Sequence, residues 1–153
     1  MAKIIVAPQH VTKEDEEFDI RLFLAGGITN CPVWQNEVIK ILQKVDKLLI
    51  YNPRRKNFPI NDPLAAQEQI MWEYNRLKNS NVLLFWFCNT TLNPIALYEL
   101  GKWGNSSTIP LFIGIEPGYK READIRMQTV LARPSIKIVM SLQELGKQVL
   151  DSL

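Results

Sequence analysis

The stretch "NVLLFWFCNTTLNPIALYELG", residues 81–101, combines a strand pattern with the helix pattern that follows it. Its first seven residues are almost entirely apolar, which is typical of a parallel strand covered on both faces. Pro94 then marks a helix start, because proline is favoured in the first turn. The helix carries one acid, Glu99, among apolar residues. A buried carboxylate is costly unless it is paired or neutralised, so Glu99 is either a satisfied structural acid or a working one.

The same alternation of apolar strands and helical patterns continues in both directions along the chain. Strands are expected at 20–26, 47–53, 81–87, 109–115 and 136–140, and helices at 32–45, 63–80, 94–104, 121–132 and 141–153. Residues 1–19 are expected to hold a short edge strand and a charged loop, "KEDEEFD". The pattern predicts one domain over residues 1–153 with a flavodoxin-like α/β fold. This fold is a three-layer, doubly wound sheet of about five parallel strands with helices on both faces.

Composition and charge narrow the class of protein. The 153 residues are 46% hydrophobic and 22% charged, and the net charge of +2 gives no argument for binding nucleic acid. No apolar run reaches the roughly 18 residues that a membrane helix needs. The two cysteines, Cys31 and Cys88, lack the spacing of a zinc or redox motif, and the chain has one histidine. We therefore expect a cytoplasmic protein with reduced cysteines, no metal, no cofactor and no membrane partner.

In doubly wound sheets ligands bind beyond the carboxyl ends of the strands. Gly26-Gly27 follows the first strand without a dinucleotide or P-loop fingerprint, so it either admits a ligand to the backbone or forms a plain tight turn. Arg54 and Arg55 follow the second strand, where they either meet a phosphate or belong to a solvated basic run. Asp62 precedes the next helix, and helix capping alone would explain it.

The predicted helix 63–80 carries further candidates. Gln69 and Glu73 are four residues apart and share one face of the helix. Trp72 packs in the core or stacks on a base, and the core interpretation is favoured because helix aromatics usually pack. Glu73 is also three residues from Arg76, so a simple ion pair on the helix surface is an equal alternative to a functional role.

Several motifs, in this order and spacing, resemble the nucleoside 2-deoxyribosyltransferase-like family: "FLAGGI", "VWQ", "YNPRR", "QIMWEYNRL", "LLFWF" and "PIALYELG". The similarity runs from about Arg21 to the C-terminus. It implies a flavodoxin-like fold and cleavage of N-glycosidic bonds in nucleosides or nucleotides. It also implies that Glu99, in its "ELG" context, is the nucleophile that forms a covalent glycosyl-enzyme with retention of configuration. Glu73 falls where the family places a second acid, near the departing base.

The chain departs from the family pattern at two positions. An acid that often holds the sugar hydroxyls is replaced by Asn93, which hydrogen-bonds without charge, and a tyrosine of the first strand is replaced by Phe23. A non-catalytic nucleotide-binding module of the same fold is therefore a second interpretation, whereas the intact "YELG" with Glu73 favours an enzyme. The expected partners are a nucleoside or nucleotide, a free base and further copies of the chain. The expected substrate-binding residues are Gly26, Gly27, Ile28, Trp34, Gln35, Asn52, Arg54, Arg55, Asp62, Gln69, Trp72 and Asn93.

Overall fold

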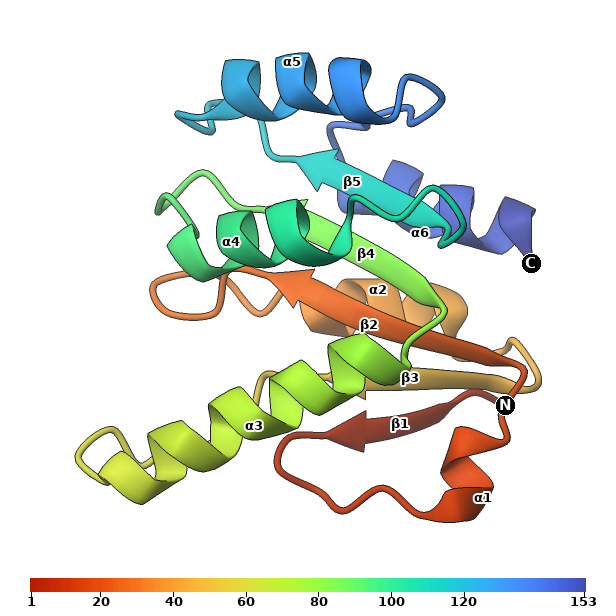
Figure 1. The fold of residues 1–153 in the computed structure, drawn as a ribbon, viewed down its shortest axis with the longest axis vertical. Coiled ribbons are helices and arrows are strands. Elements are labelled where there is room, and N and C mark those ends of the chain that lie inside the picture. Colours follow the sequence, from red (N-terminus) through yellow and green to blue (C-terminus); the bar gives the residue numbers. More distant parts are fainter.

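A computed structural model describes residues 1–153, and its centre is a sheet of five parallel strands (Figure 1). The strands are β1 (Lys3–Val6), β2 (Ile20–Gly26), β3 (Leu48–Asn52), β4 (Val82–Phe87) and β5 (Leu111–Ile115). The helices are α1 (Lys13–Glu16), α2 (Gln35–Leu42), α3 (Pro63–Asn79), α4 (Pro94–Trp103), α5 (Glu122–Ala132) and α6 (Leu142–Ser152). The predicted flavodoxin-like α/β class is confirmed. None of the helices combines the length and apolar composition that crossing a bilayer requires.

The strand order is β1-β3-β2-β4-β5, and it determines where a ligand site is expected. From β2 the chain first moves outward to β3, then returns past β2 to β4 and continues to β5. The order therefore reverses between β2 and β4, which pair in parallel up to Gly26 and Trp86. Ligand sites in doubly wound sheets lie at such a switch point, beyond the carboxyl ends of the strands. The loops after β2 and β4 meet there.

Alternate side chains of the strands enter two separate cores, one on each face of the sheet. On β2, Phe23 and Ala25 belong to the core beneath α3, α4 and α5. Leu22 and Leu24 belong to the core beneath α2 and α6. Figure 1 shows α3 and α4 in front of the sheet and α2 behind it. All residues of β3 and β4 are buried, which explains why their sequences are almost continuously apolar.

The predicted strand at 136–140 is wrong, and β1 supplies the fifth strand. The segment forms a single parallel bridge, between Gly114 and Val139, at the free edge of β5. Its apolar residues are explained by packing, because Ile136 and Ile138 contact one core and Val139 belongs to the other. An apolar segment that covers a sheet edge in this way has the same sequence pattern as a strand.

Two other features differ from the prediction, a short helix in the charged segment and the start of α2. The charged segment expected to be a loop contains α1, whose N-cap is Thr12 and whose Asp15 side chain accepts from the Thr12 backbone N–H at 3.0 Å. Helix α2 begins at Gln35 and not at Pro32. Pro32 lies in the loop between β2 and α2, where its carbonyl accepts from the backbone N–H of Trp34 at 2.9 Å. The proline therefore shapes the loop rather than the first helical turn.

Candidate active site

Two half-buried carboxyl groups lie on neighbouring helices of one face of the sheet, Glu73 on α3 and Glu99 on α4. Burial raises the pKa of Glu99 to about 8, and the charge of Glu73 adds to this shift. Burial also raises the pKa of Glu73, and a hydrogen bond from Gln69 opposes that shift. Each carboxyl group is therefore harder to ionise than an exposed one.

Gln69 fixes the position of Glu73. Its side-chain nitrogen donates to the carbonyl of Pro53 at 2.7 Å and to Glu73 Oε1 at 3.0 Å. A carbonyl only accepts, so the contact with Pro53 determines which end of the amide faces Glu73. The alternative of a Glu73–Arg76 pair is not what the structure shows, because Arg76 Nη1 lies 3.8 Å from Glu16. The loop after β3 thus orients the acid on α3.

No cation compensates this pair of acids. The chain has eight ion pairs, and neither Glu73 nor Glu99 belongs to any of them. Two interacting carboxyl groups titrate as one coupled unit, so the pair retains one proton near neutral pH. One carboxylic acid beside one carboxylate is the combination that glycosidic bond cleavage uses, as acid and as nucleophile or base.

The glycine pair after β2 is explained by packing within the protein. Gly26 has a φ of +156°, and a Cβ there would lie 2.4 Å from the Trp86 carbonyl oxygen. A Cβ on Gly27 would lie 1.7 Å from Asn93 Oδ1. Trp34 is 2% exposed, and its indole nitrogen donates to the Gly27 carbonyl at 2.9 Å. These contacts match the tight-turn alternative, and a ligand contact at this turn stays a prediction.

Arg54 holds the loop between β2 and α2. Its guanidinium donates to the carbonyls of Cys31 at 2.8 Å and Pro32 at 2.7 Å, and it lies 3.5 Å from the side-chain oxygen of Gln35. The backbone N–H of Arg54 donates to Asn52 Oδ1 at 3.0 Å. Gln35 is fully buried and its amide nitrogen has no partner. The predicted site residues Gln35, Asn52 and Arg54 therefore lie close together. The Arg54 side chain is bound to backbone carbonyls of the loop.

Arg55 and Asp62 also have internal partners. Arg55 forms an ion pair with Glu68 at 3.2 Å. Asp62 is the N-cap of α3 and accepts from the backbone N–H of Leu64 at 2.9 Å, so the capping explanation is confirmed.

Trp72 belongs to the core rather than to an open stacking surface. It is 9% exposed, its indole nitrogen donates to the carbonyl of Gln9 at 2.9 Å, and its ring meets Tyr51 edge-on at 6.3 Å between centroids. Phe23 lies on the same core, with its centroid 6.5 Å from that of Trp72. Ile28 is half-buried in the loop after β2. The core interpretation of Trp72 is confirmed.

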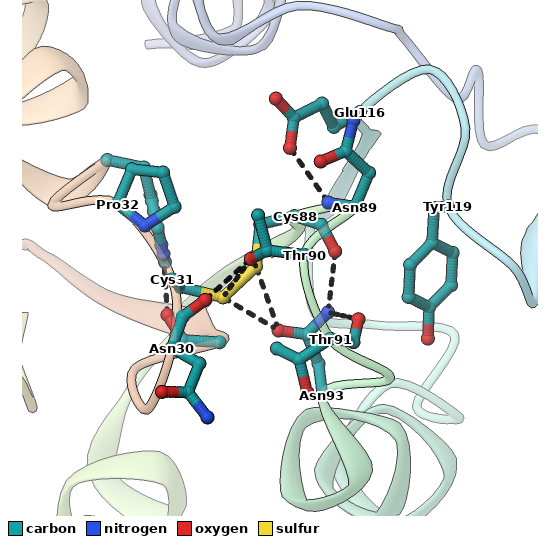
Figure 2. The surroundings of a disulfide bond; sticks show 12 residues. Asn30, Cys31, Pro32, Cys88, Asn89, Thr90, Thr91, Asn93, Glu116 and Tyr119 are labelled. Atoms are coloured by element: carbon teal, nitrogen blue, oxygen red, sulfur yellow. Dashed lines mark hydrogen bonds between the residues drawn. A yellow bond between two sulfur atoms is a disulfide. The ribbon is translucent and has the colours of Figure 1, made fainter.

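Asn93 lies at the start of α4, and its side chain holds the preceding turn in place (Figure 2). It is 3% exposed, and its backbone is left-handed, with a φ of +51°. Its side-chain nitrogen donates to the carbonyls of Cys88 and Thr91, each at 3.0 Å. Both amide hydrogens are used, so the side chain fixes the turn between β4 and α4. A role in holding sugar hydroxyls stays a prediction.

Cys31 and Cys88 form a disulfide beside Asn93, whereas the sequence predicted two reduced cysteines. The two residues are 57 apart in the chain, but each follows one of the two strands at the switch point. Nothing in the sequence alone indicated this pairing, because it depends on which strands lie side by side in the sheet. Tyr119 was not predicted from the sequence; its hydroxyl donates to the carbonyl of Leu92 at 2.6 Å and supports the start of α4.

A groove lies on the other side of α4, toward α5. Its volume is about 580 Å³, and its lining includes Leu97, Leu100 and Ile125. Neither Glu73 nor Glu99 lines it. The unpaired carboxyl groups, and not this groove, have the chemistry that a reaction needs.

A comparison with known protein families agrees with the architecture. A family model described as "nucleoside 2-deoxyribosyltransferase like" matches residues 19–119, about two thirds of the chain. A search of curated proteins found no match. The matched range contains β2 to β5 and both acidic residues of the candidate site. The chain therefore belongs to the nucleoside 2-deoxyribosyltransferase-like family.

Proposed function

We propose that this protein cleaves or transfers the N-glycosidic bond of nucleosides or deoxynucleosides, with Glu99 as nucleophile and Glu73 as general acid and base. The observation that supports this proposal is the pair of half-buried carboxyl groups on α3 and α4, which has no cation beside it. Membership of the family supports nucleosides as the substrate class.

In the first step, the Glu99 carboxylate attacks the anomeric carbon of the sugar through an oxocarbenium-like transition state. The bond from carbon to base breaks, and its electron pair leaves with the base nitrogen, which takes a proton from the Glu73 carboxylic acid. In the second step, water or another base attacks the same carbon and displaces Glu99, while the Glu73 carboxylate accepts the proton. Water gives hydrolysis and a second base gives transfer, and two inversions retain the configuration.

Near neutral pH the pKa of about 8 leaves the shared proton mainly on Glu99, so the reactive form is the one in which that proton has moved to Glu73. Because burial removes water from Glu99, its carboxylate form is poorly solvated and therefore reactive when it is present. Because the two acids interact, ionising one favours keeping the proton on the other. The hydrogen bond from Gln69 holds Glu73 in place in either protonation state. Because the two acids share one proton, the pair supplies one carboxylate as nucleophile and one carboxylic acid as proton donor.

We propose an unphosphorylated nucleoside as the substrate rather than a nucleotide. A phosphate site needs a forked arginine or a group of free donors. Arg54 already donates to two backbone carbonyls, and Arg55 is paired with Glu68. The two arginines predicted as alternative phosphate ligands therefore already have partners inside the chain.

We also propose that the protein is a homo-oligomer that associates through the helices above the acidic pair. Helices α3, α4 and α5 cover one face of the sheet (Figure 1) and expose large apolar side chains. These side chains are Leu64, Ile70, Met71, Tyr74, Ile95, Tyr98, Met127, Val130 and Leu131. Exposed apolar patches of this kind mark association surfaces. A second copy seated there would also reduce the access of water to Glu73 and Glu99.

One observation favours a second candidate, a nucleotide-binding module without catalysis. Asn93 replaces an acid of the family pattern and uses its amide hydrogens inside the protein, and Phe23 offers no polar group in place of a tyrosine. Such a module would bind nucleosides without releasing base. The two candidates therefore differ in a single measurable property.

The experiment is a base-release assay with the wild type and with Glu99→Gln and Glu73→Gln. The panel contains deoxynucleosides, ribonucleosides and their 5′-monophosphates, with and without a second free base, and products are separated by chromatography. Glu68→Gln, an exposed acid on α3, is the matched control. Base release or exchange that is lost in Glu99→Gln and kept in Glu68→Gln supports the proposal. Binding without release by the wild type identifies the non-catalytic module.

A further inference from the structure

The disulfide Cys31–Cys88 connects the loop after β2 to the carboxyl end of β4, at the switch point of the sheet (Figure 2). Both sulfur atoms lie 3.3 Å from Asn93 Oδ1. Thr90 adds a third contact between the two loops, because its hydroxyl donates to the carbonyl of Asn30 at 2.6 Å. The sulfur pair therefore sits directly against the side chain that fixes the start of α4.

The oxidation state of the sulfurs decides whether Asn93 Oδ1 receives a hydrogen bond. A thiol is a donor, whereas a disulfide sulfur has no hydrogen to donate. No other protein group donates to this oxygen, since the neighbouring Tyr119 hydroxyl donates to the Leu92 carbonyl instead. Asn93 is 3% exposed, so bulk water is a poor replacement. A buried acceptor without a donor is destabilising, so oxidation weakens the contacts of Asn93.

Asn93 in turn connects the sulfurs to the proposed nucleophile. Its backbone carbonyl accepts from the N–H of Leu97 at 3.1 Å, which forms the first turn of α4. Glu99 follows two residues later on the same helix. Gly27 packs so closely on Asn93 Oδ1 and the Cys31 sulfur that no side chain fits between them. A change in the Asn93 amide is thus passed to α4 and to the loop after β2.

We propose that Cys31 and Cys88 form a redox switch that controls the order of the first turns of α4, and through them the position of Glu99. In the dithiol form, the thiols donate hydrogen bonds to Asn93 Oδ1, and the first turns of α4 are ordered. The disulfide tethers the loop at residues 27–34 to β4 but leaves Asn93 Oδ1 without a donor. The effect on catalysis rests on the proposed function, whereas the effect on α4 does not.

The switching reaction is thiol–disulfide exchange with an external dithiol. Cys31 retains 8% of its surface and Cys88 1%, so the external thiolate attacks the Cys31 sulfur. The sulfur–sulfur bond breaks and Cys88 leaves as a thiolate, which takes up a proton. The second thiol of the reductant then displaces Cys31 from the mixed disulfide. The protein gains two electrons and two protons, and the reductant becomes a disulfide. Exchange with a small-molecule disulfide reverses the process.

Hydrogen exchange measured by mass spectrometry tests the switch without a substrate. The wild type is compared after oxidation with oxidised glutathione and after reduction with dithiothreitol, and thiol alkylation verifies zero and two free thiols. We expect oxidation to slow exchange at residues 27–34, through the tether, and to accelerate exchange at 97–101 by roughly fivefold or more, through the lost donors. Equal exchange at 97–101 in both forms, or slower exchange after oxidation, would overturn the proposal.

Two double variants separate the tether from the donors. Cys31→Ser/Cys88→Ser keeps hydroxyl donors without a crosslink, so its exchange at 97–101 should match that of the reduced wild type. Cys31→Ala/Cys88→Ala has neither, so residues 97–101 should exchange as fast as in the oxidised form while 27–34 stay untethered. Identical behaviour of the two variants contradicts a role of the donors. Base release measured on the same samples then tests the link to Glu99, so absence of activity leaves the exchange result interpretable.

Discussion

The charge of Glu73 on α3 raises the pKa of Glu99 on α4, and neither carboxyl group has a cation beside it. Asp15 shows how this chain builds a structural acid. Burial opposes ionisation of Asp15, but Lys3 and the Thr12 backbone and hydroxyl more than compensate, and its pKa is lowered. A buried acid that serves only the fold is given partners. Glu99 lacks them, which is typical of a functional group.

Removing the charge of Glu73 is expected to lower the pKa of Glu99. In Glu73→Gln the carboxyl at 99 should titrate below about 8 but still above its ordinary value of 4.5, because burial is the larger cause and remains. A titration of isotope-labelled glutamate carboxyl carbons by NMR measures this shift. Glu68→Gln, which removes an exposed acid from the same helix, should leave the pKa of Glu99 unchanged. An unchanged pKa in Glu73→Gln would show that the two acids do not interact.

The rate of base release is expected to fall at alkaline pH. The active form of the pair holds one proton, and the higher pKa of about 8 marks the loss of that proton. The value of kcat/KM for base release should therefore fall as the pH rises through about 8. A profile that stays level across this range would rule out a proton held by the pair. In Glu73→Gln the alkaline limb should disappear along with the acid.

Glu99 is expected to reduce stability at alkaline pH. Its pKa is about 8 when folded and has an ordinary value of 4.5 when unfolded, so between these values the folded protein binds more protons. The free energy of unfolding must then fall with rising pH across this window. Glu99→Gln does not titrate, so it should stabilise the protein at pH 8 relative to pH 5, by on the order of 3 kcal/mol. Urea unfolding at both pH values measures the difference, and a gain independent of pH would contradict the raised pKa.

Arg54 is expected to act on the loop and not on a phosphate. Arg54→Ala removes donors from the carbonyls of Cys31 and Pro32 and should cost about 1–3 kcal/mol of unfolding free energy. Arg55→Ala breaks a pair with the exposed Glu68 and removes the guanidinium from the Phe58 ring, and it should cost about 1 kcal/mol. The ratio of kcat/KM for a deoxynucleoside and its 5′-monophosphate should be the same in both variants. A phosphate preference that is lost in Arg54→Ala would reverse this assignment.

The sequence was sufficient for the strands that are buried on both faces of the sheet. β2, β3, β4 and β5 are nearly continuous apolar runs, and such runs are typical of parallel strands covered on both faces. The strand expected at 136–140 failed because edge packing and strand pairing require the same apolar pattern. Helix α1 was missed because its four residues are stabilised by capping and by Lys3, which lies on a different element.

The site was predictable only where residue type alone carries the chemistry. Glu99 was conspicuous as a lone acid in an apolar helix, and Glu73 as its counterpart on the preceding helix. The contacts of Arg54 and Asn93 depend on loops that meet at the switch point, and nothing local in the sequence fixes those loops. The disulfide was missed for the same reason, since a separation of 57 residues is bridged only by the topology of the sheet.

The most direct measurement is a search for the glycosyl-enzyme on Glu99. The wild type is mixed with a deoxynucleoside, quenched in acid and digested, and the peptide that contains "IALYELG" is examined by mass spectrometry. We expect one deoxyribosyl group attached to Glu99 in the wild type, accumulating with release of base and absent in Glu99→Gln. Steady base release by the wild type that persists undiminished in Glu99→Gln, with no modified peptide in either protein, would contradict Glu99 as the nucleophile.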